Sequence, residues 1–436
     1  MTKTGQDKIY RSLHRKIDNL TVRAPWNDTF YNILKKLYTP EEADVVVRMP
    51  YILSTADRIS GITGVEKTRL QGILDKLSNK GLLLDIYNAK DGQYYFMPSP
   101  VLIGLFEFTM MRTGNSHEGK EYAKLFQDYL ATFYPANFSQ GEQVSILRVI
   151  PIEETVNPED HIAFMDYEKA SSLIANTNKF ALGICSCRNE KFHNGEKECD
   201  APLDNCSAFG IGADYLIRHN IGREVSKSEM IDNFARSREL GLVFSADNTK
   251  RNPMVVCQCC KCCCNYLAGA NKFGFTNSVV TSNYVSSIDE AKCTGCGKCV
   301  KVCPVNAVSL VAANDPLKKK KKKAKVDSGI CVGCGVCAFK CSPKAMMMIN
   351  RGVRVIHPET TFERIILLSL ERGNLQNQIF DNPQSMTQNT MRIFIGAFLR
   401  LSPVKRTLMS NMFRSAFLSS ARGIARMQGK GWMLEL

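Results

Sequence analysis

The sequence predicts a multidomain α+β protein. Its 436 residues suffice for two to four domains of ordinary size. Patterns typical of helices and of short strands alternate along the chain, and no single period dominates it. The 18 cysteines all fall between residues 185 and 341. We therefore expect metal-binding segments embedded among ordinary folded regions.

The first 110 residues contain a polar start and a helical domain. Residues 1–27 are polar and basic, and we expect them to be flexible. The segment Thr39-Pro40-Glu41-Glu42 has the composition of a capping box with proline at the first helical position. A longer helix is expected over residues 65–79, where the apolar side chains form one stripe. Two strands, 82–87 and 94–97, are expected to follow as a hairpin.

This order of helices and hairpin resembles the winged helix-turn-helix fold over residues 28–110. The resemblance implies DNA binding in some proteins and docking in others, because shape alone does not determine function. The helix over residues 65–79 exposes a mildly basic set of side chains, which favours docking over DNA binding. Residues 111–144 are expected to form a helical connection.

Residues 145–285 predict a cysteine-rich domain in which short strands alternate with helices, of α/β or α+β type. A strand ends at Pro151, and helices are expected over residues 167–177, 208–219 and 226–240. Ser226 and Glu229 form the capping pair of the last of these helices. A short strand is expected at residues 242–244.

Ten cysteines in this domain predict one or two metal sites. Four thiols in the first segment are enough for one complete tetrahedral ion or one iron–sulfur cluster. Six more follow within eight residues. Because neighbouring side chains diverge, six thiols so close together indicate a cluster with several irons or ligands divided between two sites. The candidate ligands are Cys185, Cys187, Cys199 and Cys206, then Cys257, Cys259, Cys260, Cys262, Cys263 and Cys264.

Three kinds of content fit these ten thiols. They are one or two further iron–sulfur clusters, zinc, or structural and redox-switching thiols. Arg188, Lys191 and Lys261 are close enough in sequence to stabilise thiolates or a negatively charged cluster. His193 and His219 are additional candidate ligands.

Eight cysteines form two copies of one ligand pattern. The run Cys293-x2-Cys296-x2-Cys299-x3-Cys303 is followed by Pro304, and Cys331-x2-Cys334-x2-Cys337-x3-Cys341 repeats it 38 residues later. Both runs carry glycines beside the second cysteine, which allow tight turns with N–H groups aimed at sulfur. The repeated spacing disfavours zinc or a disulfide scaffold.

The two runs resemble the bacterial-type two-cluster ferredoxins, and residues 286–350 form the matching domain. The resemblance implies two 4Fe–4S clusters, with the fourth cysteine of each run serving the other cluster. One ligand set would be Cys293, Cys296, Cys299 and Cys341, and the other Cys331, Cys334, Cys337 and Cys303. Two features depart from the pattern: Ser342 precedes Pro343, and a lysine-rich insertion, residues 312–325, separates the halves.

Residues 351–436 predict a basic helical tail. From residue 382 to 434 there are eight lysines or arginines and no acidic residue, and Pro403 should break the helix. Such a helix either lies on an anionic membrane surface or packs on its own domain or on a partner subunit, and packing is favoured. The net charge of +15 and the run Lys318 to Lys323 indicate an acidic redox partner.

The sequence thus predicts an iron–sulfur electron-transfer protein that passes single electrons to or from the cysteine-rich domain or a partner oxidoreductase. One alternative is a redox- or iron-sensing DNA-binding regulator, and another is an iron–sulfur oxidoreductase subunit. No P-loop, dinucleotide fingerprint or nucleophile-elbow motif supports a stand-alone enzyme. The thiols and the lack of a long apolar run favour a reducing cytoplasm, and clusters favour a low-oxygen organism.

Overall fold

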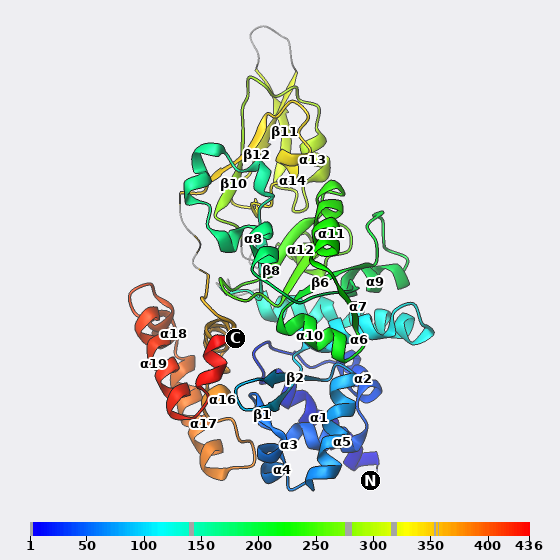
Figure 1. Ribbon diagram of the computed structural model, residues 1–436, viewed down its shortest axis with the longest axis vertical. Helices are drawn as coiled ribbons and strands as arrows, with labels where there is room; N and C mark the ends of the chain where they lie inside the picture. Colours follow the sequence, from blue (N-terminus) through cyan, green and yellow to red (C-terminus); the bar gives the residue numbers. More distant parts are fainter. Residues whose placement is uncertain (1–2, 139–143, 275–280, 315–320, 353–354, 356) are drawn as a thin grey trace.

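The computed structural model describes residues 3–138, 144–274, 281–314, 321–352, 355 and 357–436. Figure 1 shows a helical N-terminal domain at the bottom, a domain built on a central sheet in the middle and a small domain, which contains β10 to β12, at the top. The C-terminal helices lie beside the N-terminal domain. Mixed helices and sheets in several domains make the chain a multidomain α+β protein, as the sequence predicts.

The N-terminal domain combines helices with a three-stranded antiparallel sheet in the order β1-β3-β2. The predicted capping box is confirmed, since Thr39 and Glu42 cap each other's backbone at the start of α3. Its elements are α1 (Lys3–Asp18), α2 (Asp28–Leu37), α3 (Pro40–Arg48), β1 (Ser54–Thr55), α4 (Ala56–Thr63), α5 (Lys67–Asn79), β2 (Leu83–Asn88) and β3 (Gln93–Pro98).

The start of the chain differs from the expectation of a flexible segment over residues 1–27. Residues 3–18 form α1, whose Tyr10, Leu13 and Ile17 are buried. The polar residues between them occupy the other face, so average polarity concealed an amphipathic helix.

The central sheet has six strands in the order β4-β8-β9-β6-β5-β7, and every neighbouring pair is antiparallel. The α/β description of this domain is therefore wrong, because that class is built on parallel strands. Ser226 caps α11 as predicted. The strands are β4 (Leu147–Ile150), β5 (Phe180–Ile184), β6 (Asp204–Phe209), β7 (Gly222–Val225), β8 (Val243–Asp247) and β9 (Val255–Cys259).

Helices surround this sheet and connect it to the N-terminal domain. Two helices cover residues 106–113 and 117–138, as expected for a connection, whereas residues 102–104 before them have non-helical backbone angles. The helices are η1 (Val101–Leu105), α6 (Phe106–Thr113), α7 (His117–Phe138), η2 (Glu153–Thr155), η3 (Pro158–Ala163), η4 (Asp166–Glu168), α8 (Ala170–Ala175), α9 (Ser186–His193), α10 (Ile211–Arg218), α11 (Lys227–Glu239) and α12 (Asn265–Phe273).

The small domain is built from two similar halves. Strand β10 (Tyr284–Ile288) pairs with β13 (Met346–Asn350), and β11 (Val308–Ala312) pairs with β12 (Lys322–Val326). The same 38-residue offset relates β10 to β12, β11 to β13, and α13 (Lys298–Val302) to α14 (Val336–Phe339). The sequence repeat is thus a structural repeat. Lys318 to Lys320 of the lysine run lie outside the described residues, whereas Lys322 and Lys323 belong to β12.

The C-terminal region is helical, and one helix ends at Arg400 and the next begins at Ser402, so the predicted break at Pro403 is present. An ion pair of 2.9 Å between Asp381 and Arg58 joins it to the N-terminal domain. None of the described helices combines the length and apolar character needed to cross a membrane. The helices are α15 (Thr361–Glu371), α16 (Leu375–Ile379), α17 (Met386–Arg400), α18 (Ser402–Met409), α19 (Arg414–Met427) and η6 (Gly431–Glu435).

Candidate metal centres

The cysteine loops of the small domain depend on glycine. Gly295 and Gly333 have φ of +69° and +75°, a region that residues with a Cβ rarely adopt. A Cβ on Gly295 would lie 2.1 Å from the Lys322 carbonyl oxygen, and one on Gly333 would lie 2.2 Å from that of Tyr284. The backbone therefore passes too close to its neighbours for any other residue, and the two loops are held in the same shape.

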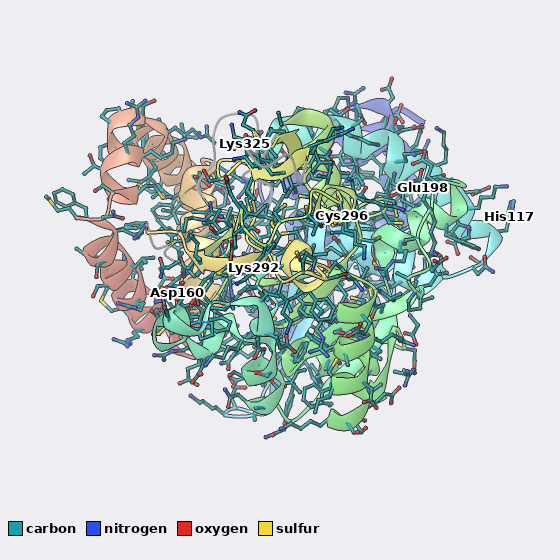
Figure 2. The ribbon with its side chains drawn as sticks, turned by 90° about the horizontal axis from the view of Figure 1, so that it is seen from above. His117, Asp160, Glu198, Lys292, Cys296 and Lys325 are labelled. Carbon is teal, nitrogen blue, oxygen red and sulfur yellow. The ribbon has the colours of Figure 1, made fainter. Side chains whose placement is uncertain are left out.

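The first group of thiols comes from both halves of this domain. One small cavity is lined by sulfur-bearing residues of both halves, namely Cys293, Cys296, Cys299 and Cys341. Residues of the stretch 343–346, which follows Cys341, also line it, together with residues of α13. Cys296 is exposed, and Figure 2 looks onto the end of the molecule where it lies. The backbone N–H of Lys298 lowers the pKa of the Cys296 thiol, as expected for a group that accepts hydrogen bonds in its charged form.

The second group is more deeply enclosed. Burial and the neighbouring thiols of Cys331 and Cys303 raise the pKa of Cys337, to about 12, and the same causes raise that of Cys334. The Ala307 N–H donates to the Cys303 sulfur at 3.2 Å, and the Ser286 hydroxyl lies 3.3 Å from the Cys337 sulfur. The structure thus brings together all four cysteines that the sequence assigns to the second set.

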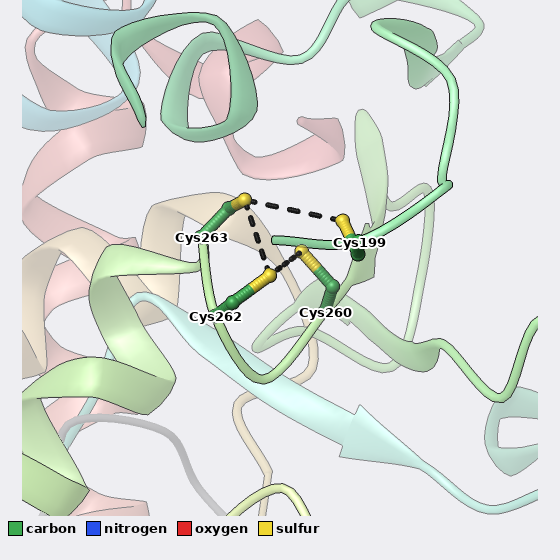
Figure 3. Close-up of side chains that lie close together, drawn as sticks. All are labelled: Cys199, Cys260, Cys262 and Cys263. Carbon is green, nitrogen blue, oxygen red and sulfur yellow. Dashed lines mark hydrogen bonds between the residues drawn. The ribbon is translucent and has the colours of Figure 1, made fainter. Parts of the chain in front are cut away.

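The ten central cysteines divide into two groups, and the division differs from the order of the sequence. Figure 3 shows the four-thiol group, which we define as Cys199, Cys260, Cys262 and Cys263. Their sulfurs all lie within 4.8 Å of one another. Individual separations are 4.0 Å between Cys199 and Cys263, 3.8 Å between Cys260 and Cys262, and 3.4 Å between Cys262 and Cys263.

The remaining thiols form the six-thiol group, defined as Cys185, Cys187, Cys206, Cys257, Cys259 and Cys264. Cys206 and Cys257 are directly opposite each other on β6 and β9. The adjacent thiol of Cys264 and burial raise the pKa of Cys187, and burial and Cys185 raise that of Cys206. The four cysteines of the first segment, although enough in number for one site, do not form a single group, because the loop after α9 places Cys199 beside residues 260–263. The dense run 257–264 contributes thiols to both groups, which agrees with ligands divided between two sites, while the metal content of the groups stays a prediction.

One buried cation serves both groups. Arg188 on α9 has no exposed surface and donates to the carbonyls of Pro202 and Gln258 at 2.7 and 2.8 Å. Its charge acts on the thiols of Cys185 and Cys260. No carboxylate among the described residues pairs with it. A buried guanidinium without a carboxylate requires another anion, and the thiolates are the anions within reach.

The other predicted partners lie elsewhere. His193 contacts the Gly114 carbonyl at 2.7 Å, and His219 contacts Asp85 at 2.7 Å. Lys191 forms ion pairs of 3.1 Å with Glu190 and with Glu196. Lys261 donates to Asn306 at 2.8 Å and so joins the cysteine loop to the small domain. Of the five basic residues named from the sequence, Arg188 is the one that acts on the thiols.

Glu107 is a functional candidate that the sequence did not reveal. It lies in the first turn of α6, where burial raises its pKa to about 7. Its charge acts on the thiols of Cys187 and Cys206. The sequence did contain a signal, since Glu107 is the single acidic residue within the apolar stretch 101–111. A carboxylate is rarely buried unless it has a partner or a function, so its presence there needed an explanation beyond packing.

One family model matches part of the chain. The 4Fe-4S dicluster domain matches residues 292–345, a segment that contains all eight cysteines of the two repeated runs. No curated protein and no solved structure matches the chain. Residues 292–345 therefore form an iron–sulfur domain of ferredoxin type. For the rest of the molecule, inferences depend on the geometry of its described residues.

Proposed function

We propose that this chain, with its iron–sulfur domain at residues 292–345, is an electron-transfer protein that holds two 4Fe–4S clusters. Cys293, Cys296, Cys299 and Cys341 would hold one, and the second group, with Cys303, would hold the other. Each cluster supplies one-electron redox chemistry at low potential when bound. The observation that carries the proposal is that each set of four thiols contains a cysteine from the opposite half of the repeat.

The chain's own residues would tune these sites through hydrogen bonds and exposure. The N–H groups of Lys298 and Ala307 point at sulfurs of the first and second groups. Such bonds stabilise the more negative, reduced state of a thiolate-bound centre. Cys296 is exposed, whereas the cysteines of the second group are buried. The first group is therefore the side at which we expect exchange with an external partner.

An acidic protein is the partner that this surface fits. Lys298, Lys301 and Lys340 line a shallow surface depression together with Phe339 and a single acidic residue, Glu239. The depression lies beside the first group, because Lys298 neighbours Cys296 and Cys299 in the chain. A positive surface at the exchange site would speed encounter with an acidic redox protein.

The second group is joined to the central domain by short hydrogen bonds. The Asn271 side chain on α12 donates to the carbonyl of Pro304, next to Cys303, at 2.7 Å. The N-terminus of α12 follows Cys264 of the six-thiol group directly. The Ile152 N–H donates to the Cys334 carbonyl at 3.1 Å. These contacts support the six-thiol group as the internal site that exchanges electrons with the ferredoxin-like domain.

The four-thiol group fits a single tetrahedral ion better than a cluster. With metal–sulfur bonds of about 2.3 Å, tetrahedral geometry places sulfurs about 3.8 Å apart. The separations of 3.4 to 4.0 Å, and the limit of 4.8 Å, agree with this value. A cubane would need wider spacing, because each thiolate binds a different iron. We propose zinc, which would fix the 260–263 loop to Cys199 without redox activity.

Metal analysis tests the proposal. Anaerobically purified protein should contain about eight irons and one zinc if the six-thiol group holds no iron, and about twelve irons if it holds a further 4Fe–4S cluster. Electron paramagnetic resonance of the reduced protein should show interacting clusters. Replacing Cys260 and Cys263 with serine should remove zinc and leave the iron count unchanged. Fewer than about eight irons in freshly prepared protein would refute the two-cluster assignment.

The DNA-binding alternative loses support from the charges on α5. The arrangement of α3 to β3 fits a winged helix, but its helix cations face acidic residues of the same domain. Lys67 pairs with Asp57 at 2.5 Å, and Arg69 pairs with Glu41 at 2.6 Å. Lys76 and Lys80 both pair with Glu42, at 3.1 and 2.8 Å. Cations neutralised in this way are poor phosphate ligands, so we propose a docking role for this domain.

A further inference from the structure

A large cavity lies where three parts of the chain meet. Its volume is about 430 Å³, within the range of small-molecule sites. The N-terminal domain and α6 contribute Leu84 and Phe108, the central sheet contributes Ala208, and the C-terminal helix α19 contributes Phe417 and Ala421. The wall is therefore predominantly apolar.

Asp85, Asp247 and Lys430 on the wall form ion pairs within the protein, and Glu107 accepts a hydrogen bond from the Gly104 N–H at 3.2 Å. Asp85 pairs with Arg218 at 2.8 Å, and Asp247 pairs with Arg364 at 2.8 Å. Lys430 lies 3.6 Å from Asp381. A charged ligand would have to compete with these pairs and lose its hydration in an apolar space. An uncharged ligand meets neither cost.

Part of the wall belongs to the six-thiol group. Cys206 and Cys257 line the cavity and retain accessible surface, although they lie on neighbouring inner strands of the sheet. Tyr266 and Glu107 line it as well, and the charge of Glu107 acts on Cys206 and Tyr266. A molecule in the cavity would thus contact sulfur on one side and hydrocarbon on the others.

The cavity is partly open to solvent, so its apolar wall is in contact with water. Soluble proteins rarely leave a large contiguous apolar surface exposed, and such surfaces commonly mark binding sites. A bound apolar molecule would remove this wall from water, which is favourable.

We infer that this cavity binds an uncharged, apolar organic molecule in contact with the thiols of Cys206 and Cys257. The inference deepens the proposed function, because it places a small-molecule partner at the internal end of the electron-transfer protein. It rests on that function only for the metal content of the six-thiol group. Binding itself follows from the size, apolarity and neutrality of the cavity.

Fluorescence titration of the anaerobically purified full chain with N-phenyl-1-naphthylamine, an uncharged apolar probe, tests the inference. We expect saturable binding of one probe per chain and a change in the visible absorption of the metal–thiolate groups. Ala421→Trp and Leu84→Trp fill the cavity from opposite walls and should each weaken binding at least tenfold. Ala416→Trp, on the exposed side of the same helix α19, is the matched control and should bind normally.

Two outcomes would overturn the inference. One is the absence of saturable binding to wild-type protein. The other is unchanged affinity in both filling variants when thermal melting shows that they are folded. Metal analysis separates the two proposals. If the ferredoxin-like domain lacks iron but the probe binds and the filling variants block it, the cavity assignment stands and the electron-transfer function is refuted. If the iron content is normal but the probe does not bind, the electron-transfer function stands and the cavity assignment is refuted.

Discussion

Replacing Arg188 with methionine should release metal from the central thiol groups. Arg188 is fully buried, and its charge acts on thiols of both groups, Cys185 and Cys260. Methionine keeps much of the side-chain volume and removes the charge. The thiolates would then be buried without a counter-ion, and a metal–thiolate site of net negative charge would be destabilised.

The expected size follows from the burial of the pair. Removing one member of a buried ion pair costs about 3–5 kcal/mol. Because about 1.4 kcal/mol corresponds to a tenfold change in an equilibrium constant, zinc affinity of the four-thiol group should fall by about a hundredfold to three-thousandfold. Arg188→Lys keeps the charge and loses the fork of donors to Pro202 and Gln258, so its loss should be smaller.

Competition with a chromophoric zinc chelator under anaerobic conditions measures this effect. Arg148→Met is the matched control, because Arg148 is also buried and also donates to two carbonyls, those of Thr249 and Tyr167, at 3.2 and 2.6 Å. Both variants should lower the melting temperature, whereas only Arg188→Met should lower zinc affinity. Equal zinc affinity in the two variants would show that Arg188 is a packing residue and that the electrostatic reasoning is wrong.

Three further predictions concern the cysteine loops, the buried acid and the lysine surface. Gly333→Ala should destabilise the protein by at least about 1 kcal/mol more than Gly352→Ala and should lower the iron content. Gly352 is the control because it has a similar φ of +79° but no atom within 4 Å of an added Cβ. Equal effects of the two substitutions in denaturant unfolding would show that the added Cβ at position 333 causes no clash. Burial raises the pKa of Glu107 to about 7, so the folded state retains this proton as pH rises from about 4.5 and stability falls until about pH 7. Glu107→Gln should remove up to about 3 kcal/mol of that fall between pH 5 and 8, and parallel unfolding curves of the two proteins at both pH values would argue against it. Lys298→Glu with Lys340→Glu should slow reduction by an acidic flavodoxin or ferredoxin at least tenfold at low salt, whereas Lys120→Glu with Lys124→Glu, on the distant α7, should not; equal rates, measured by stopped-flow absorbance, would exclude the lysine depression as the docking surface.

Local patterns predicted the elements that depend on neighbouring residues. The caps at Thr39 and Ser226 formed as expected, because a cap is a hydrogen bond between residues three positions apart. Residues 3–18 were misjudged, since their buried face is recognised only by what packs against it. Only β4 and β8 of the central sheet were located from the sequence. The other four strands and the antiparallel order were missed, because pairing joins segments that are far apart in sequence.

By itself the sequence determined the chemistry of the ferredoxin-like domain. A thiolate every third residue, turned by glycines, specifies a local backbone path, and the repeat at 38 residues specifies the second copy. The tertiary structure alone decided how the other ten cysteines are shared. The register of β6 against β9 places Cys206 opposite Cys257, and the loop after α9 carries Cys199 to residues 260–263. The cavity beside these thiols was equally hidden, because its walls come from three separate segments that only folding brings together.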